Sequence, residues 1–137
     1  MKVVLDKGAI LPTRAHEFDA GYDLYSKDDA VVYAGDSWVF DTGVHVAIEP
    51  GWVGDVKSKS GMMMKYGIIT DGTVDAGYTG SIRVKLFNLS RCAVSIVKGQ
   101  KIAQLVIKKI ATPELEVVDR LEDTERGTGG FGSTGMF

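Results

Sequence analysis

The sequence predicts an all-β fold, a jelly-roll-like antiparallel barrel or sandwich with one short helical turn and a flexible C-terminal arm. One observation is the alternation of apolar and polar residues. In the run SIRVKLFNL, for example, Ile82, Val84 and Leu86 point one way and the basic residues between them point the other. The other observation is that turn signals separate short β-rich runs, at residues 33–36, 41–43, 49–51 and 71–72.

The remaining elements follow from the same patterns. Alternation also predicts strands within residues 38–50 and over residues 101–110. The run GMMMKYG, residues 61–67, has enough unbranched residues for about one helical turn, and we expect its three methionines to fill core space. Residues 126–137 are rich in glycine, which predicts a flexible arm after a β domain of residues 1–125.

Composition narrows the possible functions. With 137 residues the chain fits a single domain, and its 16 basic and 18 acidic side chains give a net charge of -2. This balance offers no electrostatic case for nucleic-acid or anionic-membrane binding. Cys92 is the only cysteine, so no intrachain disulfide can form. We expect no signal peptide and no membrane span, and therefore a cytoplasmic protein, or one of the host cytoplasm if the origin is a phage or virus.

The C-terminal arm resembles a phosphate-binding loop only superficially. Residues 127–134 approach the pattern G-x-x-x-x-G-K-[ST], but Ser133 stands where the lysine is required. A charged run precedes the arm instead of a buried strand, and no helix is expected to follow it. The arginine, glycines, aromatic ring and hydroxyls of the arm therefore need another explanation.

Five stretches are more polar and glycine-rich than strands require: residues 20–26, 57–62, 72–80, 98–105 and the arm. Taken alone, each has an ordinary structural interpretation. Asp75 could cap a turn, Tyr78 could pack on a neighbouring strand, and KSKSG could be a solvated turn. His16 and His45 lie in none of the stretches.

In their order along the chain, these stretches resemble the five motifs of the trimeric dUTPase family, from Ala20 to Gly135. The resemblance implies a jelly-roll subunit and a homotrimer. It also implies hydrolysis of dUTP to dUMP and pyrophosphate, with Mg2+ on the triphosphate and water attacking the α-phosphate. This reaction keeps uracil out of DNA and supplies dUMP for dTMP synthesis.

The resemblance also implies roles for individual residues. Asp75 would be the general base that activates the attacking water, and Gln104 would help to hold that water. Asp23 would lie beside the water ligands of Mg2+ without binding the ion directly. Tyr78 would pack against the deoxyribose and exclude a 2'-hydroxyl. A hairpin around residues 68–74, with Gly72, would read uracil through its backbone.

The phosphates would be bound by two regions. Lys59, Ser60 and Gly61 match the motif that meets them, although Lys59 stands where the family most often has arginine. The arm would reach from a neighbouring subunit, so that three subunits share each site. In the arm, Phe131 would cover the uracil, and the terminal phosphate would be held by Arg126, Gly132, Ser133 and Thr134.

Two alternatives remain open from the sequence. A dCTP deaminase shares the jelly roll and the trimer, but Asp75, Tyr78 and the complete arm follow the dUTPase pattern. The second alternative is a non-catalytic nucleotide-binding or regulatory module. Two departures from the family pattern leave it open, Lys59 and also Gly77, where many family members have a second acidic residue. Ammonia release from dCTP would identify the first, and absence of pyrophosphate release from dUTP the second.

Overall fold

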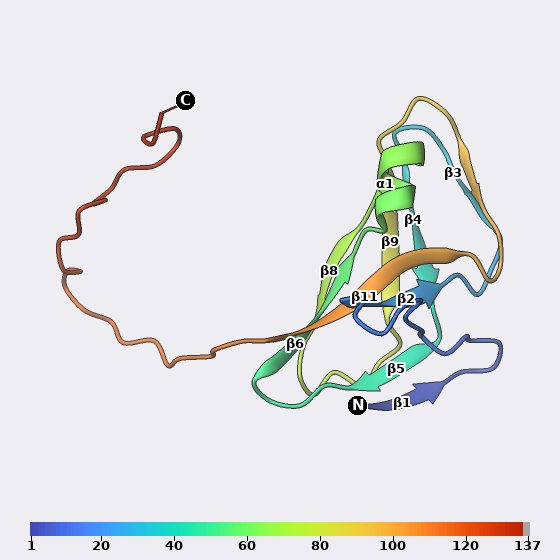
Figure 1. Cartoon of the computed structure of the whole chain (residues 1–137), viewed down its shortest axis with the longest axis horizontal. Helices are drawn as coiled ribbons and strands as arrows, with labels where there is room; N and C mark the ends of the chain where they lie inside the picture. The colour runs from blue at the N-terminus through green and yellow to red at the C-terminus, as the bar shows by residue number, and fades with distance from the viewer. Residues whose placement is uncertain (136–137) are drawn as a thin grey trace.

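The computed structural model describes residues 1–135, and these contain eleven strands and one helix (Figure 1). The all-β prediction is confirmed. In chain order the elements are β1 (Lys2–Leu5), β2 (Gly21–Tyr25), β3 (Ala30–Val32), β4 (Ser37–Asp41), β5 (Val44–Ala47), β6 (Trp52–Lys57), α1 (Ser60–Tyr66), β7 (Ile68–Ile69), β8 (Asp71–Val74), β9 (Arg83–Asn88), β10 (Val94–Ile96) and β11 (Lys101–Lys109).

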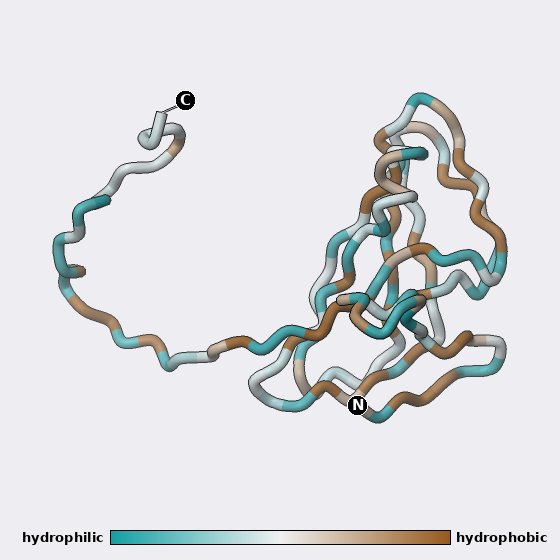
Figure 2. Tube along the Cα trace, in the orientation of Figure 1, coloured by the Kyte–Doolittle hydropathy of each residue, from teal (hydrophilic) through white to brown (hydrophobic). Residues whose placement is uncertain are grey.

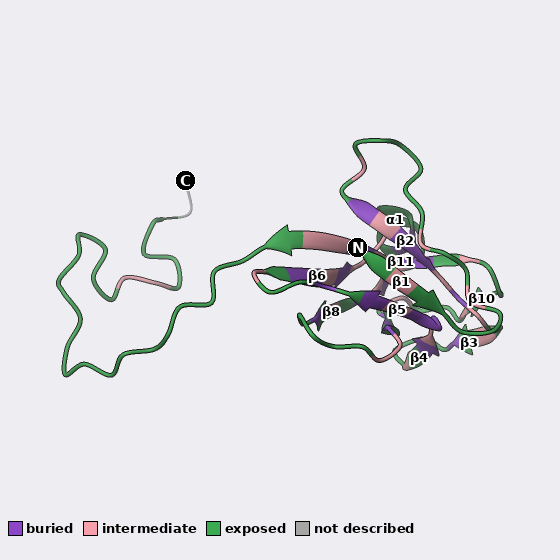
Figure 3. Ribbon diagram, turned by 90° about the horizontal axis from the view of Figure 1, so that it is seen from below, coloured by how far each residue is buried: buried purple, intermediate pink, exposed green. Residues whose placement is uncertain are grey.

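The strands form two larger sheets and two strand pairs, and every pairing is antiparallel. One sheet has the order β2-β11-β6-β8 and the other β4-β9-β7, while β1 pairs with β5 and β10 with β3. Buried apolar residues from both larger sheets and both pairs make one core. In Figure 3 the buried stretches lie inside this body and not along the C-terminal segment.

Strand β9 has the alternation that the sequence predicts, because Val84, Leu86 and Asn88 are buried and the residues between them are exposed. The buried Asn88 is satisfied, since its amide nitrogen donates to the carbonyl oxygens of Val32 and Cys92, each at 2.8 Å. Strand β11 departs from strict alternation. Its pairing with β2 shifts register after Lys101, so two successive residues both face the core.

Helix α1 is longer than the predicted single turn, and Gly67, which directly follows its last residue, adopts a left-handed φ of 63° that terminates it. The prediction that all three methionines fill core space is wrong. Met62 is buried, whereas Met63 and Met64 are exposed. Successive helical residues point in different directions, so a short helix packed by one face cannot bury three in a row.

The predicted turn at residues 71–72 and the predicted hairpin at residues 68–74 are also wrong. Asp71 and Gly72 lie inside strand β8, which pairs with β6, whereas β7 pairs with β9 in the other sheet. The chain therefore crosses between sheets at Thr70 instead of folding back on itself. The loop that follows β8 spans residues 75–82 and leads into β9.

The C-terminal segment leaves the body at the end of β11 (Figure 1). The structure describes no strand or helix for residues 110–135, so this segment begins before the predicted boundary at residue 125. It carries apolar residues (Figure 2), and Leu115 and Val117 are 95% and 97% exposed. Residues 136 and 137 of the predicted arm lie outside the described residues. In the described part of the chain, no helix has the length and apolarity needed to cross a membrane.

Candidate functional site

A row of polar residues crosses one end of the β2-β11-β6-β8 sheet. Gln104 of β11 lies opposite Asp23 of β2 on one side and opposite Lys57 of β6 on the other. Lys57 in turn lies opposite Asp71 of β8. Because the strands run antiparallel in register, residues far apart in sequence meet at this end. We call Asp23, Lys59, Ser60, Gly61 and Gln104 the strand-end cluster.

Asp23 is the most buried member of the strand-end cluster, with 5% of its surface exposed. One carboxylate oxygen accepts a hydrogen bond from Lys59, and the other lies 2.6 Å from the Lys101 ammonium. Burial alone would raise the pKa of Asp23, but hydrogen bonds from Lys101 and Lys59 outweigh burial and lower this pKa. Asp23 is therefore a carboxylate at neutral pH.

Gln104 is held from two sides. Its amide nitrogen donates to the Ser58 carbonyl oxygen at 3.0 Å. Its Oε1 lies over Gly21, where an added Cβ would be 2.5 Å from that oxygen, so the position requires glycine. These contacts fix the amide with its oxygen still able to accept a hydrogen bond from water.

Lys59, Ser60 and Gly61 form the junction between β6 and α1. Lys59 is in extended conformation directly before the helix, and Ser60 and Gly61 are its first two residues. A Cβ at Gly61 would meet nothing within 4 Å, so the space beside this backbone is open. The opening leaves room for a group larger than water close to the main chain.

Asp75 begins the loop of residues 75–82, which we call the Asp75 loop. Its carbonyl oxygen accepts from the Tyr78 amide at 3.1 Å, and Gly77 has a φ of 85° that few other residues adopt. The Tyr78 hydroxyl donates to the Ser81 carbonyl oxygen at 3.1 Å. The Tyr78 ring lies against Gly80, where any Cβ would collide with it. Asp75 and Tyr78 are both exposed.

Residues outside the Asp75 loop anchor its second half. The Ser81 hydroxyl donates to Asp41, and this bond, with one from the Gly43 amide, lowers the pKa of Asp41. The Thr42 hydroxyl donates to the Ile82 carbonyl oxygen at 2.7 Å. His45 of β5 contacts the Thr79 carbonyl oxygen at 2.8 Å through Nδ1.

Some of these contacts are not predicted from the sequence. Lys101 lies in one of the five polar stretches, so its place beside Asp23 could have been considered. Asp41 belongs to a predicted turn signal and His45 to a strand of ordinary alternating pattern, and neither signal indicates a contact with the Asp75 loop.

The strand-end cluster and the Asp75 loop lie at opposite ends of the same sheet. Asp71 is in the row with Gln104, whereas Asp75 is four residues further along the chain. Four strand residues span about 13 Å. Within one subunit, therefore, the structure does not bring Asp75 and Tyr78 together with Gln104. Gly72 pairs with Val56 inside the sheet, next to the row.

The predicted residues of the arm are far from both regions. In the described part of the arm, each hydrogen bond joins residues within 124–135, such as that from Arg126 Nε to the Gly129 carbonyl oxygen at 3.0 Å. Phe131 is fully exposed and has a left-handed φ of 48°. Ser133 and Thr134 are exposed as well, and Gly132 is adjacent to them. The subunit alone does not place the arm on either region.

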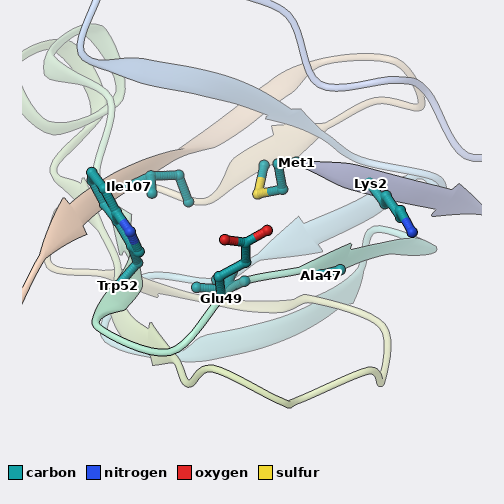
Figure 4. Close-up of a pocket in the computed structure, with 7 residues that line it drawn as sticks. Met1, Lys2, Ala47, Glu49, Trp52 and Ile107 are labelled. Carbon is teal, nitrogen blue, oxygen red and sulfur yellow. The ribbon is translucent and has the colours of Figure 1, made fainter.

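A hollow near the N-terminus contains none of the predicted residues (Figure 4). Its lining is mostly apolar, with the Glu49 carboxylate as one exception. No nucleophile or base faces Glu49 there, so the hollow offers no constellation for the predicted reaction. The lining residues are Met1, Lys2, Ala47, Ile48, Glu49, Trp52 and Ile107.

The described residues offer no cage of ligands for a directly bound Mg2+. Residues 1–135 contain no group of three or more acidic, histidine or cysteine side chains that could hold a metal. Both oxygens of Asp23 are engaged by lysines. The residues therefore do not fit a directly bound ion, but Asp23 fits a contact to the water ligands of an ion carried by phosphate.

Comparison with known proteins identifies the family. The family model described as dUTPase matches residues 7–135. The deoxyuridine 5'-triphosphate nucleotidohydrolase of Clostridium acetobutylicum is 41% identical over 135 residues, which cover 96% of this chain and 93% of that protein. The enzyme of the same name from Solanum lycopersicum is 42% identical and covers 96% of this chain and 79% of its own.

Solved structures agree with this match. The dUTPase of Staphylococcus bacteriophage 80alpha with dUpNHpp has a TM-score of 0.93 and 34% identity, with 98% of each chain covered. A dUTPase variant from phage phi11, whose structure reveals a structural Mg(II) ion, has a TM-score of 0.83 and 31% identity, with 89% of this chain and 98% of that chain covered. The jelly-roll prediction is confirmed, dUTP hydrolysis is supported as the activity, and neither alternative is favoured. The chain belongs to the dUTPase family.

Proposed function

We propose that the chain hydrolyses dUTP to dUMP and pyrophosphate at sites that three subunits of a homotrimer share. The observation that carries this proposal is the separation of the two halves of the site. The strand-end cluster and the Asp75 loop lie at opposite ends of one sheet, which supports a site in which Asp75 acts on a substrate bound by another subunit.

In the proposed reaction, Asp75 removes a proton from a water molecule whose oxygen attacks the α-phosphorus. The bond from that phosphorus to the bridging oxygen breaks, and pyrophosphate leaves with the bonding electrons. Gln104 orients the water through Oε1, because its amide nitrogen already donates to Ser58. The exposure of Asp75 in the single subunit leaves it free to face a neighbouring one.

The nucleotide would be positioned by both halves of the site. Ser60 and Gly61 would meet the phosphates at the open backbone before α1. Lys59 would add charge there, shared between the phosphates and Asp23. Tyr78 would pack against the deoxyribose, so that a 2'-hydroxyl would be buried without room or a partner. Gly72 would lie beside the uracil.

The arm would close the site over the bound triphosphate. Arg126, Gly132, Ser133 and Thr134 would hold the terminal phosphate, while Phe131 covers the base. Ordering about ten residues costs on the order of 10 kcal/mol or more, whereas stacking one ring yields only about 1–3 kcal/mol. Contacts to the phosphates must supply most of the remainder, so the arm should order with a triphosphate and release the monophosphate.

Amide hydrogen exchange tests this model of the arm. A non-hydrolysable dUTP analogue should protect residues 126–135, and dUMP should leave them unprotected. Equal protection by both ligands would refute the closing role. Deletion of residues 126–137 should abolish turnover and leave the fold intact, because no described arm residue adds to the core. A large fall in Tm would contradict that expectation.

The exposure of apolar residues also supports association between subunits. Leu115 and Val117 stand almost fully in solvent on a segment that leaves the body. Burying such side chains against a neighbouring subunit would recover about 1.5–3 kcal/mol each. Light scattering would test this, since a fully active monomer would overturn the shared site.

Magnesium would enter with the substrate. Asp23 would accept hydrogen bonds from water ligands of an ion bound to the triphosphate. When bound, the ion would neutralise phosphate charge that develops in the transition state. We expect the protein in the cytoplasm, or in the host cytoplasm for a phage, and expect no direct nucleic-acid partner.

The function is tested by a substrate panel of dUTP, dTTP, dCTP and UTP, each with and without Mg2+. Of the four nucleotides, only dUTP should release pyrophosphate rapidly, and this release should require Mg2+. Ammonia release from dCTP would identify a deaminase instead. Binding of dUTP without any pyrophosphate release would identify a non-catalytic module.

A further inference from the structure

We infer that His45 is a positioning residue for the Asp75 loop. One ring nitrogen bonds the loop at Thr79 and the other bonds Asp6 beside β1, so the ring ties the loop to the β1–β5 pair. The inference rests on the proposed function, because it assigns to His45 the placement of Asp75 and Tyr78. The family resemblance attributes no role to His45, and the residue lies in none of the five motif stretches.

The first observation is how few contacts hold the middle of the Asp75 loop. Residues 81 and 82 are bonded to β4, to its following turn and to β5, through Asp41, Thr42 and the Val44 carbonyl oxygen. For residues 75–80, the remaining hydrogen bonds among the described residues are internal to the loop, with one exception. That exception is His45, whose Nδ1 lies 2.8 Å from the carbonyl oxygen of Thr79. Thr79 directly follows Tyr78.

The second observation is what the other ring nitrogen meets. His45 Nε2 lies 3.2 Å from a carboxylate oxygen of Asp6, just after β1. Asp6 is itself fixed, because its amide donates to the Gly43 carbonyl oxygen at 2.9 Å. A carbonyl and a carboxylate can only accept hydrogen bonds. The ring therefore faces one acceptor on each side, and only the imidazolium, with two N–H groups, satisfies both.

The charges around His45 favour this protonated form. Asp6 faces it from the end of β1, and Asp41 of β4 acts on it at longer range. Lys2 is the opposing charge on the same face of the β1–β5 pair, two residues from Val4, which lies opposite His45. The Thr79 carbonyl and then Asp6 raise the pKa of His45 above its usual value of about 6.5.

The pH dependence follows from this direction. A raised pKa means that the tie is complete below about pH 6.5 and is lost as the pH rises through the folded-state value. The neutral ring keeps one N–H, so it can bond either Thr79 or Asp6 but not both. The Asp75 loop should then move more freely, so a smaller fraction of the molecules should hold Tyr78 in its binding position.

Kinetics of three variants test the inference. His45→Val removes both bonds, whereas His45→Asn places an amide nitrogen close to the Nδ1 position and keeps a donor for Thr79 without titrating. His16→Val is the matched control, because it removes the other histidine of the chain, whose ring makes no described hydrogen bond to the loop. KM and kcat for dUTP and UTP are measured from pH 6 to 9.

We expect His45→Val to raise KM for dUTP about three- to tenfold, the size of one or two lost hydrogen bonds. It should also reduce the preference for dUTP over UTP, and His45→Asn should restore most of both losses. As pH rises, the parent ring loses one of its two bonds, so the ratio of KM between His45→Asn and the parent should fall towards one. Changes in dUTP ionisation cancel in this ratio. An unchanged sugar preference and KM in His45→Val would overturn the inference, even if its Tm falls.

A second measurement does not depend on activity. The C2 proton of His45 is followed by NMR during a pH titration of the parent and of Asp6→Asn. The pKa of His45 should lie above the usual histidine value of about 6.5, and Asp6→Asn should lower it. A pKa of His45 that does not change in Asp6→Asn would refute the tie. Failure of the parent protein to hydrolyse dUTP would refute the proposed function instead, and the NMR result would still stand.

Discussion

The strand-end cluster and the Asp75 loop solve the same problem, the placement of a few polar side chains, by different means. The cluster is held by a buried carboxylate between two lysines and by an amide packed over a glycine. The loop is held by hydrogen bonds to backbone carbonyls and by one glycine, Gly80, that leaves room for a tyrosine ring. The cluster suits the binding of phosphate charge, whereas the loop leaves Asp75 and Tyr78 exposed for another subunit.

The largest expected effect is on the chemical step, and it comes from Asp75 in the Asp75 loop. Asp75→Asn removes the general base and should lower kcat for pyrophosphate release by about 10³-fold. Its Tm should remain close to that of the parent, because Asp75 is exposed. Asp55→Asn is the control, a carboxylate of the same sheet that pairs with Lys108 at 2.6 Å. Turnover of Asp75→Asn at the parent rate would remove Asp75 from the mechanism.

On the cluster side, Gln104→Ala should lower kcat about 10²-fold, because the attacking water loses its orientation. The Ser58 carbonyl also loses its donor. Binding of a non-hydrolysable analogue, measured by calorimetry, should change much less than kcat. A loss that appears only in analogue affinity would make Gln104 a binding residue and not a water-orienting one.

A smaller effect is expected from Gly80→Ala in the Asp75 loop. The added methyl group would collide with the Tyr78 ring and displace it. We expect the preference for dUTP over UTP to fall about tenfold, the lower end of what one misplaced packing contact costs. Gly35→Ala is the control for the collision of an added methyl group. Nothing lies within 4 Å of its added Cβ, although its φ of 75° adds strain. Unchanged sugar preference in Gly80→Ala would mean that Tyr78 does not sense the sugar.

The smallest expected effect concerns stability at the cluster. Asp23→Asn leaves Lys59 and Lys101 without their shared carboxylate and should lower the free energy of unfolding by about 1–3 kcal/mol. Because the pKa of Asp23 is lowered, its contribution is present above about pH 3.8 and is lost as pH falls through the folded-state value. Urea unfolding at pH 7 and pH 3 should therefore show a smaller difference between variant and parent in acid. An equal difference at both values would contradict the ionic role.

Much of the fold was predictable from local pattern, because burial of alternate residues in β9 leaves a direct trace in its sequence. The crossing at Thr70 was not, since Asp71 and Gly72 are typical turn residues and only pairing with β6 makes them a strand. The burial of the three methionines was predicted wrongly for a similar reason, because hydrophobicity alone does not say which helix face meets the core.

For the candidate site, the motif residues were predictable and their support was not. The positions of Asp23 and Gln104 follow from the resemblance, and the structure places them opposite each other. The bond from His45 to Thr79 joins a residue of β5, a strand of ordinary pattern, to a loop residue 34 positions away. The closure of the arm remains a prediction, because within residues 1–135 of one subunit the hydrogen bonds of the arm join only residues 124–135.

The most direct test of the shared site is complementation between two inactive variants. Asp75→Asn and the protein lacking residues 126–137 are unfolded together, refolded as a mixture, and assayed for pyrophosphate release from dUTP. If each site draws Asp75 and the arm from different subunits, random mixing should restore about a quarter of the sites. If the mixture remains as inactive as each variant alone while light scattering shows mixed trimers, then one subunit supplies both groups and the account is wrong.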